Sequence, residues 1–264
     1  MDDRDAGNSS ATLLSTVVPS VAERLRAAGC VYADDEARLL AEAASGDALD
    51  ALVERRVAGE PLEHLLGWAA FAGLRVAVAP GVFVPRRRTE LLVRETVALA
   101  PRVVVDLCCG CGAVAAAVAA ALPGAEVHAA DVDPAAVACA RRNVPGEVHL
   151  GDLYAALPDA LRGRVDVLVA NAPYVPTAEI PLMPPEARDH EPLVALDGGG
   201  DGLDPHRRIA AGATEWLAPG GHLLVECAER QVPALAAAFA AAGLAPRAVR
   251  DEELDATAVV GRRP

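Results

Sequence analysis

Apolar positions recur along this chain with two different spacings. Between residues 11 and 70 they fall on one face of short helices, as Ala37, Leu40 and Ala44 do. From residue 91 onward, short apolar runs alternate with longer stretches of helical spacing. The runs predict strands at 103–107, 127–130, 148–150, 165–170, 222–227, 246–250 and 257–261, and the stretches predict helices at 113–122, 134–143, 205–217 and 231–242. This alternation predicts an α/β fold, a parallel sheet with helices on both faces.

The change of spacing divides the chain into four predicted segments. Residues 1–10 are polar and are expected to form a disordered tail, and residues 11–73 predict a small helical domain. Residues 74–90 are expected to form a β-hairpin linker that turns at Ala79-Pro80-Gly81. The α/β domain then covers residues 91–264. In such a domain, ligands bind at the carboxyl ends of the strands.

Composition and charge exclude several classes of protein. With 53% hydrophobic and 23% charged residues, the chain is typical of globular proteins. Its net charge of −13 disfavours long-range capture of DNA or RNA, so no DNA partner is expected. The run Arg86-Arg87-Arg88 is a candidate for a local basic patch, although we favour its interpretation as a solvated face. The chain contains no lysine, which excludes a mechanism based on a catalytic lysine.

Hydropathy and cysteine spacing indicate in which cellular compartment the protein is expected. No apolar run predicts a membrane span, and the acidic N-terminus does not match a secretory signal, so a cytoplasmic protein without a membrane partner is expected. The six cysteines are expected to be reduced thiols. Cys108, Cys109 and Cys111 crowd one turn, which would strain a tetrahedral metal site, so no metal is expected there.

A glycine-containing loop follows the first predicted strand of the α/β domain. It comprises Asp106, Leu107, Cys108, Cys109, Gly110, Cys111 and Gly112. Its two glycines allow a sharp turn and a close approach of the backbone to a ligand, and the helix that follows presents free N–H groups to that ligand. A dinucleotide-binding loop would carry a third glycine, which is absent here. A tight structural turn is the alternative interpretation.

Two acidic residues follow the next predicted strands. Asp131 comes nineteen residues after Gly112, at a position where a carboxylate can accept both hydroxyls of a ribose. Asp152, after the third strand, can accept the amine of adenine, and Leu153 can pack on the purine. A helix cap is the alternative role for Asp131, because Pro134 follows, and a plain turn is the alternative for Asp152.

The apolar run 165–170 ends in the loop Asn171-Ala172-Pro173-Tyr174. Such a loop can hold a planar –NH2 group, because the Asn171 side-chain oxygen and the Ala172 carbonyl each accept one N–H. The ring of Tyr174 can cover the plane of that group. Methyl transfer onto an amide or a nucleobase amine needs this arrangement. An ordinary turn is the alternative, since asparagine and proline are common in loops.

These motifs resemble those of the HemK/PrmC family, protein-(glutamine-N5) methyltransferases that modify the Gly-Gly-Gln loop of class I peptide release factors. The resemblance runs from about residue 55 to the C-terminus. Its pieces are Gly59-Glu60-Pro61, Gly67, Phe71, Gly73, Val84-Pro85-Arg86, Thr89-Glu90, the loop from Asp106 to Gly112, Asp131, the loop from Asn171 to Tyr174, Glu191-Pro192, Gly198-Gly199 and Asp201-Gly202-Leu203-Asp204.

The resemblance implies a class I, Rossmann-like methyltransferase domain, a helical domain that recognises the substrate, S-adenosylmethionine as cofactor, and a release factor or a similar protein as substrate. It implies that Asn171 and Tyr174 are catalytic and that the loop from Asn171 to Tyr174 binds the substrate. The residues implied in cofactor binding are Asp106, Cys108, Cys109, Gly110, Cys111, Gly112, Asp131, Asp152, Leu153 and Asn171.

Three features depart from the family pattern. Ala172 replaces the first proline of Asn-Pro-Pro-Tyr, but its carbonyl remains and the following proline favours an extended backbone, so the acceptor geometry is expected to persist. Cys108 stands at a glycine position, where either its Cβ narrows the cofactor pocket or the site does not require positive φ. Arg87 and Arg88 replace a proline and an acidic residue near the expected substrate entrance, which suggests a paralogue with a different protein substrate.

Three other functions stay open from the sequence. A nucleic-acid exocyclic-amine methyltransferase shares a similar loop, but the charge of −13 and the lack of a basic recognition module oppose it. A catalytically inactive S-adenosylmethionine-binding interaction protein would explain Ala172, Cys108 and Arg88, whereas the presence of Asn171 and Asp131 opposes it. Methylation of a small molecule or a modified peptide is the third, and it depends on the entrance of the pocket.

Overall fold

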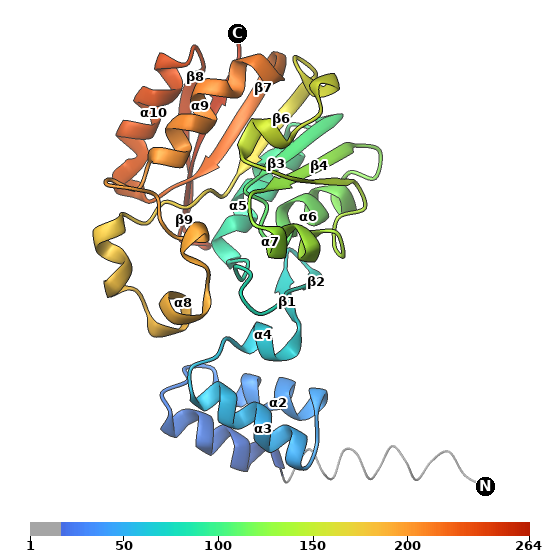
Figure 1. Cartoon of the computed structure of the whole chain (residues 1–264), viewed down its shortest axis with the longest axis vertical. Coiled ribbons are helices and arrows are strands. Elements are labelled where there is room, and N and C mark those ends of the chain that lie inside the picture. The colour runs from blue at the N-terminus through green and yellow to red at the C-terminus, as the bar shows by residue number, and fades with distance from the viewer. Residues whose placement is uncertain (1–16) are drawn as a thin grey trace, which may run out of the picture. The chain divides into compact units, whose positions relative to one another are not determined.

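The computed structural model describes residues 17–264 of the chain (Figure 1). The described residues form two compact units, one of residues 17–67 with Pro185–His190 and one of Trp68–Pro184 with Glu191–Pro264. The tail predicted at residues 1–10 lies outside the described residues. Within residues 17–264, no helix is both long and apolar enough to cross a membrane.

The first unit is made of short helices, as the spacing of its apolar residues predicts. Residues 17–27 are helical, and α2 (Ala33–Ala43), α3 (Asp47–Val57) and α4 (Leu62–Leu66) follow. These helices bury a small apolar core, which includes Leu25, Leu40 and Val53. The presence of helices before the α/β domain is therefore confirmed.

A buried ion pair lies inside the first unit. Arg56 Nε donates to Glu36 at 2.6 Å, and both side chains are only 9% exposed. Arg56 also reaches Glu186, on α8 (Pro185–His190), at 3.2 Å. This second contact joins a segment from late in the sequence to the helices at its start.

The hairpin lies earlier in the chain than predicted. β1 (Trp68–Phe71) and β2 (Leu74–Ala77) pair antiparallel. Ala72 and Gly73, between them, both have positive φ (47° and 78°), as a two-residue hairpin turn requires. The chain does turn at Ala79-Pro80-Gly81, where Val82 N donates to Ala79 O at 3.0 Å, but residues 82–86 form no strand, so the prediction of a hairpin around this turn was wrong. Proline and glycine are the stronger turn signal, whereas alanine rarely adopts the positive φ that the observed hairpin turn uses.

The second unit is built on a seven-stranded sheet with the order β5-β4-β3-β6-β7-β9-β8. Its strands are β3 (Val103–Leu107), β4 (Glu126–Asp131), β5 (Glu147–Leu150), β6 (Val165–Ala170), β7 (Leu217–Glu226), β8 (Ala245–Asp251) and β9 (Ala256–Arg262). Its longer helices are α5 (Glu90–Ala98), α6 (Ala113–Ala121), α7 (Pro134–Ala140), α9 (Asp204–Trp216) and α10 (Val232–Ala241). The predicted α/β fold is confirmed.

One edge of the sheet corrects the prediction of purely parallel pairing. The strands from β5 to β7 pair in parallel, but β9 runs antiparallel to both β7 and β8. The connection between β8 and β9 spans only residues 252–255, and a loop this short can join antiparallel strands but not parallel ones.

Apolar side chains fill both faces of the sheet. Alternate residues of the central strands point to opposite faces, so Val104 and Val167 belong to one apolar cluster and Val105 and Leu168 to the other. The second cluster includes Trp216, which is 1% exposed. Because both faces of the sheet are covered, a ligand can bind to the sheet only at the ends of its strands.

The strand order reverses between β3 and β6. From β3 the chain continues to β4 and β5 on one side, whereas β6 and β7 lie on the other side (Figure 1). The loops that follow β3 and β6 therefore leave the sheet next to each other, at the position where such folds bind ligands. These are the two loops in which the sequence places its candidate site.

Candidate active site

A cavity of about 540 Å³ lies at the carboxyl ends of the central strands. The predicted site residues that line it are Asp106, Cys108, Cys109, Gly110, Cys111, Asp131, Asp152, Leu153, Asn171, Ala172, Pro173 and Tyr174. Gly112, which directly precedes α6, is the one predicted site residue that does not line it. The structure thus brings together two sets of residues that the sequence keeps about 60 positions apart.

The carboxylate of Asp131 is held by two backbone N–H groups. Gly110 N donates to Oδ2 at 2.8 Å, and Asp133 N donates to Oδ1 at 2.9 Å. Asp131 does not cap the next helix, since Asp133 takes that role by accepting from Ala135 N at 2.8 Å. An ionised carboxylate has about four acceptor positions, so each oxygen of Asp131 keeps capacity for a ligand hydroxyl. Burial raises the pKa of Asp131.

Cys108 adopts the backbone conformation that the family pattern assigns to glycine. Its φ is 56°, in the left-handed region, and it lines the cavity. For a residue with a Cβ this conformation costs about 1–2 kcal/mol. Positive φ is therefore required at this position, and the side chain of Cys108 occupies part of the cavity wall. Burial raises the pKa of the Cys108 and Cys109 thiols, and it raises that of Cys111 to about 12, so none of the three is a thiolate at neutral pH.

Two further acidic residues of the cofactor constellation are anchored by the protein itself. Asp106 is 1% exposed and accepts from Ala115 N, in the first turn of α6, at 3.1 Å. Burial raises the pKa of Asp106 to about 8. Asp152 pairs with Arg208 of α9 at 2.6 Å. Leu153, which follows it, also lines the cavity and has a positive φ of 48°.

The carboxamide of Asn171 has a defined orientation. Its Nδ2 donates to Thr89 Oγ1 at 3.0 Å, and the Thr89 hydroxyl lowers the pKa of the nearby Glu226 carboxyl. Because the amide nitrogen is the donor of this bond, Thr89 Oγ1 is its acceptor. The NH2 of Asn171 is thereby committed to the protein, and its oxygen is left for a ligand.

Tyr174 is fixed at both ends. Its hydroxyl donates to Glu226 Oε1 at 3.1 Å, and its backbone carbonyl accepts from Gln231 Nε2 at 3.0 Å. Gly202, from the stretch Asp201-Gly202-Leu203-Asp204, packs behind this carbonyl, and a Cβ there would lie 2.3 Å from the Tyr174 oxygen. Burial raises the pKa of Tyr174, and the nearby Glu226 raises it further, so the phenol stays protonated.

Glu226, at the end of β7, lies behind the cavity wall. Its side chain is 3% exposed, and Arg88 Nε donates to Oε1 at 3.1 Å. Burial raises the pKa of Glu226, whereas Thr89, Arg88 and Tyr174 lower it. Glu226 and Thr89 were missed as site residues from the sequence. Glu226 could have been found from the sequence, because it is an acidic residue at the end of an apolar run, 223–226, and strand ends lie at the carboxyl edge of the sheet.

The arginine run contributes to the cavity rather than to a basic patch. Arg86 pairs with Glu191 at 2.6 Å, and the Glu191 side chain is 1% exposed. Arg88 pairs with Glu226 as described above, but its side chain is 46% exposed, and Arg87 is exposed as well. The interpretation of the run as a solvated face therefore fits Arg87 and Arg88, whereas Arg86 is 33% exposed and pairs with a buried carboxylate.

Apolar side chains form part of the cavity lining. Leu193 and Val194 line it and are 60% and 52% exposed. Met183 also lines the cavity.

Comparison with known proteins places this arrangement among methyltransferases. The model of the methyltransferase small domain matches residues 73–182. The chain is 42% identical to a release factor glutamine methyltransferase of Geobacter sulfurreducens over 73% of this chain and 69% of that protein. It is 41% identical to one of Mycolicibacterium smegmatis over 81% of this chain and 84% of that protein.

Two further comparisons set the range of the similarity. A 4-amino-L-phenylalanine/4-methylamino-L-phenylalanine methyltransferase of Streptomyces pristinaespiralis is 39% identical over 72% of this chain and 69% of that protein. Among solved structures, a methyltransferase of Pyrococcus furiosus has a TM-score of 0.56 at 16% identity, over 72% of this chain and 89% of that chain. At that identity the second similarity concerns the fold alone.

Proposed function

Because this chain belongs to the release factor glutamine methyltransferase family, we propose that it methylates the side-chain amide nitrogen of a glutamine in a peptide chain release factor or a related protein. The family membership confirms the resemblance drawn from the sequence, and with it the class I methyltransferase fold and S-adenosylmethionine as the cofactor. Substrate recognition by the helical domain predicted at 11–73 is part of this proposal.

The residues of the cavity fit that cofactor. Asp131 has spare acceptor capacity for two ribose hydroxyls, and the pair Asp152 and Leu153 offers an acceptor and an apolar surface for adenine. When bound, the cofactor supplies a methyl group on a positively charged sulfur. The three thiols of the loop are protonated, so they do not compete as nucleophiles for this methyl group.

The fixed orientation of Asn171 is the observation that carries the proposal. A substrate carboxamide has two N–H groups, and the Asn171 oxygen and the Ala172 carbonyl are two acceptors at adjacent positions of one loop. Since the NH2 of Asn171 is bonded to Thr89, the side chain presents an oxygen rather than a second donor. These acceptors hold the nitrogen in place and favour the positive charge that grows on it as the new bond forms.

Such positioning accounts for a large part of the rate that a poor nucleophile needs. An amide nitrogen shares its lone pair with the carbonyl, which is why rotation about the amide bond has a barrier of about 18–20 kcal/mol. Correct placement of two reacting groups can supply about 7–11 kcal/mol. A preorganised polar group in the site adds about 10²–10³ in rate. Tyr174, held by Glu226, covers the site and excludes water.

The entrance supports a protein segment over a nucleic acid. The exposed side chains of Leu193 and Val194 suit apolar contacts with a polypeptide. The arginines that line the cavity, Arg86, Arg88 and Arg208, each pair with a carboxylate, so their charge is already compensated. Together with the net charge of −13, this leaves little attraction for a phosphate backbone.

The test is methyl transfer from labelled S-adenosylmethionine in three parallel reactions, with a class I release factor, with ribosomal RNA and with 4-amino-L-phenylalanine. Label in the release factor, located by mass spectrometry on the glutamine of its Gly-Gly-Gln peptide, is the expected result. Label only in RNA or only in the amino acid would assign the chain to one of those substrates instead. No label in any reaction, with S-adenosylhomocysteine still bound, would favour an inactive binding protein.

The variant Asn171→Ala tests the role of the loop in the same assay. It removes one acceptor and leaves Asp131 in place, so we expect turnover to fall by about 10² or more while the affinity for S-adenosylhomocysteine stays within a few-fold. Unchanged turnover in this variant would contradict the role given to the loop.

A further inference from the structure

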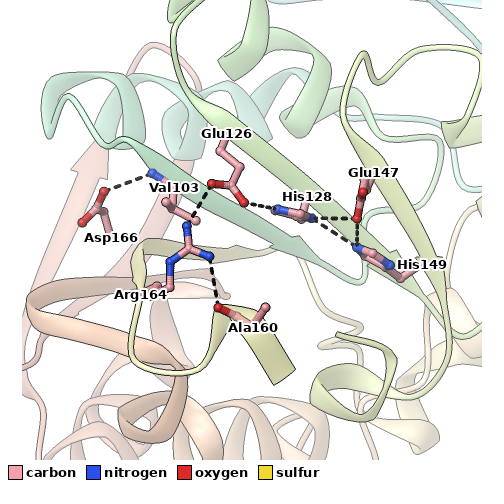
Figure 2. Close-up of polar contacts among 8 residues, drawn as sticks. All are labelled: Val103, Glu126, His128, Glu147, His149, Ala160, Arg164 and Asp166. Carbon is pink, nitrogen blue, oxygen red and sulfur yellow. Dashed lines mark hydrogen bonds and ion pairs between the residues drawn. The ribbon is translucent and has the colours of Figure 1, made fainter. Parts of the chain in front are cut away.

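Two histidines and a glutamate gather on β4 and β5, outside the cavity (Figure 2). In the parallel register of these strands, His128 lies opposite Glu147 and Ala130 lies opposite His149. Residues two positions apart on a strand share a face, so all three side chains lie on the same face of the sheet. Among the residues that the structure describes, this is the group of His, Cys, Asp and Glu side chains with metal-ligand spacing.

We propose that His128, His149 and Glu147 bind a single Zn²⁺ ion. The distance from His128 Nδ1 to His149 Nε2 is 3.2 Å, and each of these atoms lies 3.7 Å from Glu147 Oε2. A triangle with these sides has a circumradius of about 2.1 Å, so one point lies within zinc–ligand distance of all three atoms. The site therefore closes with little movement.

Glu126 and Arg164 set the tautomer of His128 that such a site needs. His128 Nε2 lies 2.9 Å from Glu126 Oε1, and because a carboxylate only accepts, this nitrogen carries the proton. Arg164 holds the other oxygen of Glu126 at 3.3 Å and donates to the Ala160 carbonyl at 3.1 Å (Figure 2). Nδ1 of His128 is then an acceptor that faces the cluster. A carboxylate behind a ligand histidine is the usual second layer of a zinc site.

The ligand set favours zinc over the hard cations. Two of the three ligands are imidazoles, which are borderline ligands that suit zinc, whereas Ca²⁺ and Mg²⁺ require mostly oxygen. The His128 and His149 side chains are 7% and 18% exposed, while Glu147 is 70% exposed. An ion can therefore enter from the side of Glu147, and a water molecule can complete a tetrahedral set.

Zinc at this position would fasten an edge strand. β5 has four residues and pairs only with β4, so few hydrogen bonds hold it. It leads directly to Asp152 and Leu153, which line the cavity. A shared ion would add a cross-strand link and steady the loop that follows.

Without an ion, the same geometry is a hydrogen bond from His149 Nε2 to Nδ1 of His128, between rings whose centroids are 5.5 Å apart. The two interpretations differ in what the protein does with added metal. Zinc binding is measured by titration calorimetry on the untagged full-length chain after treatment with EDTA, and Co²⁺ is then added to read the ligand type from its visible spectrum.

We expect one equivalent of zinc to bind, with a Co²⁺ spectrum that lacks thiolate charge-transfer bands. His149→Ala should weaken zinc binding by about 100-fold or more and Glu126→Gln by about 10–100-fold. His190→Ala and Glu253→Gln, a histidine and a glutamate outside the cluster, are the matched controls and should stay within twofold. Zinc should also raise the melting temperature of the wild type but not that of His149→Ala.

Three results would overturn the proposal. These are the absence of saturable binding of one equivalent, equal binding by His149→Ala and the wild type, and a Co²⁺ spectrum dominated by thiolate ligation. The variants are placed at the more exposed His149 and at Glu126, 45% exposed, so that the fold is kept. A circular dichroism spectrum identical to that of the wild type checks this for each variant.

Discussion

Thr89→Val separates the orientation of Asn171 from its presence. Valine has nearly the shape of threonine but no hydroxyl, so the variant loses the acceptor for Asn171 Nδ2 at 3.0 Å and the polar group that lowers the pKa of Glu226. Thr89 is 3% exposed, and water does not readily replace its hydroxyl. The loss of this buried hydrogen bond, with the Asn171 donor left without its partner, corresponds to a stability loss of about 1–3 kcal/mol.

The larger effect is expected on turnover. Without Thr89 as acceptor, the Asn171 carboxamide can flip, so that its NH2 instead of its oxygen faces the NH2 of the substrate. The acceptor oxygen still reaches the correct position for part of the time, so the loss should be smaller than the 10²–10³ that complete removal of such a group causes. We expect kcat to fall by about 10–100-fold, with the affinity for S-adenosylhomocysteine within about threefold.

The assay is methyl transfer to the release factor at saturating S-adenosylmethionine, with calorimetry for S-adenosylhomocysteine. Thr96→Val is the matched control, because Thr96 is 0% exposed and its Oγ1 has no hydrogen-bond partner among the described residues. It should leave turnover unchanged. Thr89→Ser, which keeps the hydroxyl, should recover most of it. If Thr89→Val retained a kcat within twofold of the wild type, the orientation argument would be refuted.

Three further predictions concern the cofactor site and stability. Asp131→Ala should weaken S-adenosylhomocysteine binding by about 10²-fold in calorimetry, since it removes a charged acceptor, while kcat at saturating cofactor changes little; unchanged affinity would contradict its role. His206 is 0% exposed and burial lowers its pKa from 6.5 to about 4, so its contribution to stability is complete above pH 6.5 and is lost as the pH falls to 4. In urea unfolding followed by tryptophan fluorescence, the wild type should therefore lose about 3 kcal/mol relative to His206→Gln over that interval, and parallel curves would exclude the effect. Arg56→Met should destabilise the first unit by about 3–5 kcal/mol in urea unfolding followed by circular dichroism, because it leaves Glu36 buried without its charge partner, and Arg56→Met/Glu36→Leu should recover most of the loss.

The sequence was most informative where local pattern decides structure. The strands at 103–107 and 165–170 have the bounds that their apolar runs predict, because a strand buried on both faces leaves a continuous apolar signal. α5 was not predicted, although Glu90–Ala98 carries a buried apolar face. The hairpin was misplaced because its turn uses an alanine at positive φ, which local statistics disfavour.

The residues of the candidate site also fall into those that the sequence predicts and those that it does not. Residues that follow a strand, such as Asp131 and Asn171, could be found from the sequence because the fold places all strand ends at one edge. The groups that orient them could not, since Thr89 and Glu226 lie 82 and 55 positions from Asn171. A hydrogen bond between side chains so far apart leaves no periodic signal in a single sequence.

Arg88 illustrates how a departure from the family pattern acquires a physical meaning in the structure. From the sequence alone, an arginine in place of an acidic residue was compatible with loss of catalysis. In the structure its guanidinium lies 3.1 Å from Glu226, which is buried, and favours the ionised form of that carboxylate. The same carboxylate accepts from the hydroxyl of Tyr174, the last residue of the acceptor loop, at 3.1 Å. Arg88 therefore supports the orientation of the acceptor loop, and the argument predicts that Arg88→Met lowers turnover more strongly than it lowers affinity for the cofactor.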